Sequence, residues 1–192
     1  MQEAVEPPTA LPVDRLPRIA PGARSDVGWP TWLLARAAGI VGRTQPPNLF
    51  LTLGRHRRLF RSWLRFAGRL MPRGRLPRRD TELAILRVAH LRRCRYEFEH
   101  HVRIGRRSGV ADADLRRVLD GPEAPGWTPR EAAILAAVDE LHTDGDVREE
   151  TWDRLRAHLD DNDLIELVML VGHYEMLATT ITALGIQPDR RG

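Results

Sequence analysis

The chain has 192 residues, of which 42% are hydrophobic and 29% charged, and its net charge is only +4; this composition predicts a soluble globular protein with one domain, or two small ones sharing a core. Its single cysteine, Cys94, excludes a disulfide framework within the chain and a thiolate zinc cluster. No apolar run approaches the ~20 residues that span a bilayer, and the N-terminus lacks a secretory pattern, so we expect a cytoplasmic protein without a membrane partner.

The N-terminal segment is rich in proline. Prolines stand at positions 7, 8, 12, 17, 21 and 30. Because proline fixes φ and has no backbone N–H, we expect residues 1–30 to form an extended arm. A helical domain is predicted to follow it, over residues 31–187.

Helical spacing of apolar residues continues through the rest of the chain. Proline pairs and glycine-containing loops separate the segments, and no segment shows strand alternation with hairpin turns. The sequence therefore predicts an all-α fold. The expected helices span residues 31–41, 49–70, 80–107 (with Asp80 as a cap), 112–119, 129–141, 147–159 and 162–184.

Two short stretches of the sequence are repeated within these helices. Glu82 and Glu131 each open a similar apolar pentapeptide, and Tyr96-Glu97 recurs as Tyr174-Glu175. Two helical halves of related design would explain the repetition.

Arginines dominate residues 55–79, although the chain contains no lysine. Apolar residues recur among them at helical spacing, so the arginines are expected on the solvated side of an amphipathic helix. No aromatic-basic module accompanies the charge. We therefore predict no nucleic-acid partner.

The segment CRYEFEHH, residues 94–101, concentrates the chemically active side chains. On a helix, Cys94, Glu97 and His101 share one face, and Glu97 and His101 are close enough to hydrogen-bond. An exposed carboxylate–imidazole pair is the simplest alternative. Glu97 and His100 also match the Glu-x-x-His spacing of di-iron bundles, but such a site needs a second motif that the chain lacks. No metal is predicted.

The segment RRDTELAILRVAHLRRCRYEFEHHVRIGRRSGV resembles the carboxymuconolactone decarboxylase family, which includes the alkyl hydroperoxidase D-like proteins. The flanking stretches PNLFLTLGRHRRLFRSWLRFAG, GPEAPGWTP and VGHYEMLATTITALGI are similar as well. Peroxidase members carry a glutamate, eleven residues, and then Cys-x-x-Cys-x-x-x-His. In this chain Glu82, Cys94 and His101 fall on that register, and Glu97 replaces the second cysteine. The resemblance implies an alkyl hydroperoxidase D-like helical bundle that forms a homo-oligomer, as a dimer, trimer or hexamer.

The replacement by Glu97 bears on the reaction. In the hydroperoxidases the second thiol resolves a sulfenic acid, which a glutamate cannot do, and a carboxylate beside Cys94 raises the pKa of the thiol. Decarboxylase-type members resemble this chain in keeping the histidine without that cysteine. The resemblance thus implies a decarboxylase-like lyase without cofactor, acting on a small carboxylated, lactone-type substrate. In that enzyme His101 is the acid–base group, and Glu97 and Glu82 orient it.

Several alternatives stay open beside this interpretation. Tyr96 and His173 are candidates to line the substrate pocket, but core packing would explain either residue. The protein would instead be a thiol peroxidase if Cys94 worked alone with an external thiol. It would be a non-catalytic helical oligomer if the acid–histidine cluster were only a structural network.

The proposed site requires a break in the helix. Glu82 precedes Glu97 by fifteen residues, and a straight helix would separate them by about 22 Å. Convergence of Glu82, Glu97 and His101 therefore predicts a break between His90 and Cys94. No glycine or proline marks that position, so the expectation comes from the resemblance.

Overall fold

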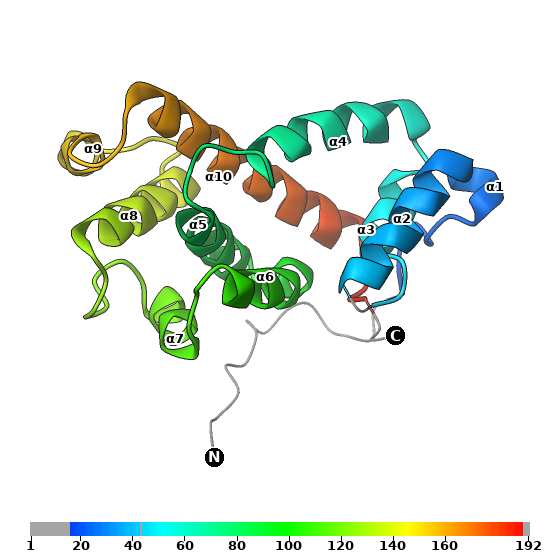
Figure 1. Cartoon of the computed structure of the whole chain (residues 1–192), viewed down its shortest axis with the longest axis horizontal. Coiled ribbons are helices and arrows are strands. Elements are labelled where there is room, and N and C mark those ends of the chain that lie inside the picture. Colours follow the sequence, from blue (N-terminus) through cyan, green and yellow to red (C-terminus); the bar gives the residue numbers. More distant parts are fainter. Residues whose placement is uncertain (1–15, 43, 190–192) are drawn as a thin grey trace, which may run out of the picture. The chain divides into compact units, whose positions relative to one another are not determined.

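The computed structural model describes residues 16–42 and 44–189, and Figure 1 shows the chain. Every regular element among these residues is an α-helix, which confirms the predicted fold class. The helices are α1 (Arg24–Val27), α2 (Trp29–Gly42), α3 (Asn48–Leu53), α4 (Arg57–Leu70), α5 (Arg78–Leu91), α6 (Arg95–Arg107), α7 (Asp112–Asp120), α8 (Pro129–Thr143), α9 (Glu149–Arg156) and α10 (Asp161–Leu184).

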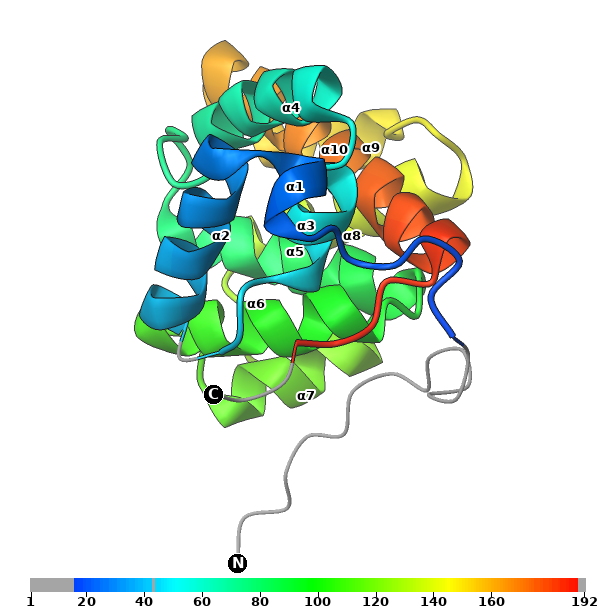
Figure 2. The same cartoon turned by 90° about the vertical axis from the view of Figure 1, so that its right-hand side faces the viewer.

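The described chain forms two compact units. The first, called unit 1 below, spans Arg73–Thr179 and holds α5 to α9 with most of α10. The second, unit 2, comprises residues 16–72 and 180–189 and holds α1 to α4 with the end of α10. Within unit 2, α1 packs against α2, α2 against α3 and α3 against α4, and Figure 2 shows these helices from the side.

Two predicted boundaries in unit 2 differ from the structure. The expected extended arm contains α1, whose first turn closes because the Asp26 carboxylate accepts a hydrogen bond from the Ala23 N–H at 2.9 Å. Residues 1–15 of the predicted arm lie outside the described residues. The helix expected over residues 49–70 is divided into α3 and α4, because α3 ends at Gly54 and His56 caps α4 by accepting from the Leu59 N–H.

Helix α5 lies at the centre of unit 1, and α6, α7 and α8 all pack against it (Figure 1). The ten consecutive residues Asp80–Ala89 are buried, so this helix is enclosed on every side rather than on one face. A core of apolar side chains from α5 to α8 surrounds it. This core consists of Leu83, Leu86, Ala89, Phe98, Val110, Leu115, Val118 and Leu135.

Each buried charge on α5 has a partner. Arg87 donates from Nε and Nη2 to the two carboxylate oxygens of Asp139, at 2.6 and 2.8 Å. Asp80 accepts from Arg130 Nε at 2.7 Å. The prediction that Asp80 caps this helix is wrong, because α5 begins two residues earlier, at Arg78, and Asp80 is part of its first turn.

The predicted break between His90 and Cys94 is confirmed, since α5 ends at Leu91 and α6 begins at Arg95. The Cys94 N–H bonds to the Ala89 carbonyl at 2.8 Å and the Arg93 N–H bonds to the His90 carbonyl at 2.9 Å. This pair of bonds is a Schellman motif, whose left-handed position glycine usually occupies. Here Arg93 takes that position, with φ of 51°.

Helix α10 is the longest helix of the described chain. By length and composition alone it could cross a membrane, but 44% of its most apolar stretch is buried inside the molecule. A core helix passes the same test. The side chains of Leu164, Leu167, Leu170 and Val171 are all buried.

Replacing Arg93 with glycine is expected to stabilise the protein. The left-handed conformation costs an L-residue roughly 1–2 kcal/mol, and the extra freedom of glycine in the unfolded chain offsets about half of the relief, which leaves a gain of about 0.5–1 kcal/mol. Arg93 is exposed, so little packing is lost. Urea unfolding measures the gain. Arg65→Gly, at an exposed position inside the helix α4, is the control and should destabilise. An Arg93→Gly protein no more stable than the parent would contradict the assignment of a costly left-handed backbone conformation to Arg93.

Candidate functional site

The break between α5 and α6 brings Glu82 and His101 into contact. The Glu82 Oε2 atom lies 2.8 Å from His101 Nδ1, although nineteen residues separate the two in sequence. Both side chains are buried, with 0% and 6% of their surface exposed. Arg78, one turn before Glu82 on α5, donates from Nη2 to the other carboxylate oxygen at 2.9 Å. The result is an Arg78–Glu82–His101 chain in which Glu82 and His101 are buried and the Arg78 side chain is 36% exposed.

This arrangement determines which nitrogen of the His101 imidazole carries the proton. An ionised carboxylate accepts hydrogen bonds only, so Nδ1 of His101 is the atom that carries the proton shared with Glu82. The Nε2 atom is then the nitrogen available to take up or give a proton. This is the orientation that a carboxylate gives to a histidine acting as general acid or base.

Tyr174, on α10, forms another wall of the site. Its ring meets the His101 ring edge-on, with centroids 5.1 Å apart and planes at 87°. Burial raises the pKa of the Tyr174 phenol well above its usual value, and the carboxylates of Glu97 and then Glu82 raise it further. The phenol therefore lies within electrostatic reach of both glutamates and keeps its proton.

Glu97 lies near this chain without joining it. Its residue is 3% exposed, and neither carboxylate oxygen has a hydrogen-bond partner among the described residues. The predicted hydrogen bond from Glu97 to His101 is therefore not formed, because Glu82 occupies His101 Nδ1. Burial raises the pKa of Glu97 to about 8, with the thiol of Cys94 acting in the opposite direction.

Cys94 caps the N-terminus of α6 and is 2% exposed. Burial raises the pKa of its thiol, and the neighbouring Glu97 carboxylate raises it further. Since the thiolate rather than the thiol is the nucleophile, this environment disfavours reaction at the sulfur.

The other predicted residues lie around the site rather than in the chain. Tyr96 is buried and stacks on the His100 ring at 6.5 Å, with planes at 12°. His173 is buried and packs edge-on against Tyr174 at 5.2 Å. Burial lowers the pKa of His173 to about 4 and that of His100 to about 3, so neither carries charge near neutral pH. The contact with His100 agrees with core packing as the explanation for Tyr96. His173 packs against Tyr174, which in turn contacts His101.

A second network of the same composition lies beside the first. Arg92 pairs with Glu175 at 2.5 Å, and the other oxygen of Glu175 lies 2.7 Å from His142 Nδ1. It is less buried than the first network, with 24% of the His142 side chain exposed. Within the described residues, no three histidine, cysteine, aspartate or glutamate side chains are grouped to hold a metal ion.

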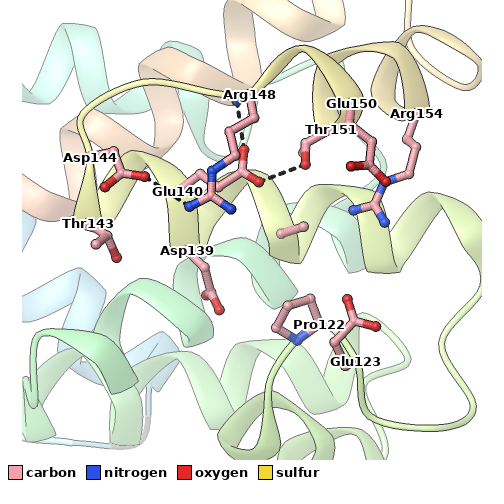
Figure 3. Close-up of a pocket in the computed structure, with 11 residues that line it drawn as sticks. Pro122, Glu123, Asp139, Glu140, Thr143, Asp144, Arg148, Glu150, Thr151 and Arg154 are labelled. Atoms are coloured by element: carbon pink, nitrogen blue, oxygen red, sulfur yellow. Dashed lines mark hydrogen bonds and ion pairs between the residues drawn. The ribbon is translucent and has the colours of Figure 1, made fainter.

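A pocket of about 330 Å³ lies elsewhere in unit 1, between the loop after α7 and helices α8 and α9 (Figure 3). Its polar groups largely bond to each other: Glu140 accepts from the Arg148 N–H and from Thr151 Oγ1. None of the predicted site residues lines it.

Arg78 and Tyr174 belong to the site but were not predicted. A signal for each is present in the sequence. Arg78 precedes Glu82 by four residues, the spacing of an ion pair on a helix. Tyr174 stands in the repeat of the Tyr-Glu pair, whose first copy contains Glu97.

Comparison with known proteins identifies relatives of this arrangement. Residues 57–140 match the model of the carboxymuconolactone decarboxylase family. This match covers α4 to most of α8 and includes Glu82, Cys94, Glu97 and His101. The family resemblance seen in the sequence is thereby confirmed. No curated protein matches the chain.

Three solved structures share the fold. A peroxidase-related protein from Ralstonia eutropha JMP134, described as an alkylhydroperoxidase AhpD core, is 20% identical, with a TM-score of 0.78 over 93% of this chain and 94% of that one. A peroxidase-related protein from Silicibacter sp. TM1040 is 16% identical, with a TM-score of 0.75 over 98% and 95%. The debrominase Bmp8 is 18% identical, with a TM-score of 0.75 over 88% and 91%. At these identities the likeness establishes the alkyl hydroperoxidase D-like fold.

Glu97→Gln is expected to change how stability depends on pH. A carboxyl whose pKa rises from 4.5 to about 8 on folding binds more protons in the folded state. The folded state therefore loses stability as pH rises from about 4.5, and the loss is complete above about 8. Glutamine does not titrate. The variant should match the parent near pH 5 and exceed it near pH 9, by on the order of 3 kcal/mol.

Urea unfolding of both proteins at the two pH values measures this difference. Glu99→Gln is the control, because Glu99 lies on the same helix in a partly exposed pair with Arg95 and should show no such pH-dependent gain. Equal differences between variant and parent at both pH values would show that Glu97 is ionised throughout.

Proposed function

Because residues 57–140 belong to the carboxymuconolactone decarboxylase family, we propose that this protein is an enzyme whose histidine performs acid–base chemistry on a small carboxylated, lactone-type substrate. The observation that carries the proposal is the Arg78–Glu82–His101 chain, in which the Glu82 and His101 side chains are buried. Burying a carboxylate costs free energy unless the carboxylate is well bonded. A carboxylate that orients an imidazole is also a common way to prepare a histidine for proton transfer.

The proposed reaction is a decarboxylation followed by a proton transfer. The bond between the substrate carbon and its carboxylate breaks, carbon dioxide leaves, and the electron pair is delocalised into the lactone as a dienolate. Nε2 of the His101 imidazolium then donates a proton to carbon, and the imidazole regains a proton from solvent. Throughout, Glu82 accepts the Nδ1 hydrogen bond and stabilises the imidazolium.

Of the two glutamates, only Glu82 orients the histidine in this proposal, since Glu97 makes no bond to it. Tyr174 fixes the tilt of the His101 ring through their edge-on contact. A small cyclic substrate is also in keeping with a relative of the same fold: the structure of Bmp8 is known in complex with 2,3,4-tribromopyrrole.

The thiol peroxidase is the less favoured alternative. A peroxidase needs a thiolate that reaches the peroxide, whereas Cys94 is buried and the pKa of its thiol is raised. The chain also offers no second cysteine to resolve a sulfenic acid.

His101→Ala is expected to lower kcat for a carboxylated lactone by about 10²–10⁴-fold, which is the usual contribution of a positioned acid–base group. Glu82→Gln should cause a smaller loss, because it alters the orientation of the imidazole and not its presence. Cys94→Ser should retain turnover. Steady-state assays of carbon dioxide release measure all three.

The opposite pattern would support the peroxidase. In that case Cys94→Ser would abolish peroxide reduction, and mass spectrometry would detect a sulfenic adduct of Cys94 in the parent protein. Absence of turnover with either substrate class, together with lost stability in His101→Ala, would support the non-catalytic oligomer.

We also propose that the protein is a homo-oligomer. Helix α10 exposes apolar side chains on one face: 63% of Ile165, 47% of Met169 and 49% of Met176 are exposed. Light scattering at micromolar concentration should give a multiple of 21.8 kDa. Met169→Asp should reduce the mass toward one chain if this face is the interface, because a charge at the apolar centre of an interface is costly. A mass of 21.8 kDa that does not change with concentration would contradict the oligomer.

A further inference from the structure

The reaction proposed above leaves one group of the site without a role. Glu97 is 3% exposed, and both of its carboxylate oxygens lack a hydrogen-bond partner among the described residues. Leaving a buried polar group unsatisfied destabilises the folded state, and more so when the group is charged. Such a group in a folded protein calls for a functional explanation.

The titratable groups that face Glu97 come from three elements, and no cation among them pairs with it. At the end of α5, Arg92 is bonded to Glu175 at 2.5 Å. On α10, Glu175 is bonded to both Arg92 and His142. At the start of α6, Cys94 carries a neutral thiol. Glu97 is therefore a carboxyl group whose neighbouring cation is already used by another carboxylate.

Glu97 also lies on the same helix as the proposed acid–base residue. It follows Cys94 on α6 and precedes His101 by one helical turn. The phenol of Tyr174, which touches the His101 ring, is within electrostatic reach of both Glu97 and Glu82. A substrate held against the His101 imidazole would thus lie close to the Glu97 carboxyl.

We propose that Glu97 is a substrate-binding residue that uses a neutral carboxyl group to donate a hydrogen bond to the enolate oxygen of a lactone. This inference rests on the proposed function, because it names the form of the substrate that the site recognises. The donor would stabilise the negative charge that develops when carbon dioxide leaves. It would meet that charge in a buried site, where such a bond is stronger than in water.

The protonation state of Glu97 agrees with this role. Burial raises its pKa to about 8, so the carboxyl keeps its proton at neutral pH. A carboxylic acid held neutral in an apolar site is an established kind of oxyanion donor in enzymes. Above about pH 8 the same group becomes an anion and repels an enolate.

Isothermal titration calorimetry with tetronate tests the proposal. Tetronate is a five-membered lactone enolate that is ionised throughout the range between pH 6 and pH 9. Since only the protonated form of Glu97 binds it, the apparent Kd should be about tenfold weaker near pH 9 than near pH 6. The neutral γ-butyrolactone should bind without this dependence on pH.

Variants of Glu97 separate its role from that of the histidine. Glu97→Gln keeps a donor that does not titrate, so tetronate should bind at both pH values about as it binds the parent near pH 6. Glu97→Met keeps the volume but removes the donor and should weaken binding near pH 6 by about tenfold or more, since a lost hydrogen bond to a charged group costs about 1.5–3 kcal/mol. Glu99→Gln, on the same helix, is the control and should behave as the parent does.

Several results would overturn the inference. These are the absence of tetronate binding near pH 6, binding by the parent that does not weaken with pH, or a pH dependence that persists in Glu97→Gln, which would assign it to His101 or another group. The proposed function fails separately, if His101→Ala leaves lactone turnover unchanged. Turnover that depends on His101, without tetronate binding that depends on Glu97, would refute this inference and leave the proposed function standing.

Discussion

A helix enclosed on every side can carry charge only where each charge meets a partner, and the structure of unit 1 depends on how α5 meets this condition. Arg87 is neutralised by Asp139, and Asp80 by Arg130. Glu82 is held by Arg78 and His101. Removing one partner from a buried ion pair commonly costs about 3–5 kcal/mol, so these pairs constrain how α5 packs on its neighbours. The candidate site is one of them. The same electrostatic requirement that fixes the helix in the core also aligns the imidazole.

Local sequence predicted the helices well where apolar spacing and caps agree. Helix α8 begins as expected, because the Thr128 hydroxyl accepts from the Glu131 N–H and the Glu131 carboxylate accepts in return from the Thr128 N–H. The break after α5 has no such signal, since Arg93 occupies a position at which glycine is usual. Tertiary packing imposes that conformation, so only the family resemblance predicted it. The burial of ten consecutive residues of α5 was equally hidden, because periodicity reports one apolar face and not a helix covered all round.

The candidate site was predicted in part for the same reason. The register of Glu82, Cys94 and His101 follows from one stretch of sequence, and their proximity needed only the break. Which carboxylate bonds to the histidine could not be read from spacing, since helical neighbours favour Glu97 and the structure selects Glu82. Tyr174 comes from a helix more than seventy positions later, and its contact with His101 depends on how α10 packs in unit 1.

The position of Cys94 makes its thiol a probe of transient opening at the junction between α5 and α6. Its sulfur lies at the helix junction, is 2% exposed, and is the only thiol of the 192 residues. A reagent such as iodoacetamide can modify it only in molecules whose junction has transiently opened, so the alkylation rate under native conditions gives the free energy of that opening. Because the same junction holds Glu82 against His101, this rate also reports how often the contact between these two side chains is lost and re-formed. The Cys94 sulfur would thus measure the integrity of the site.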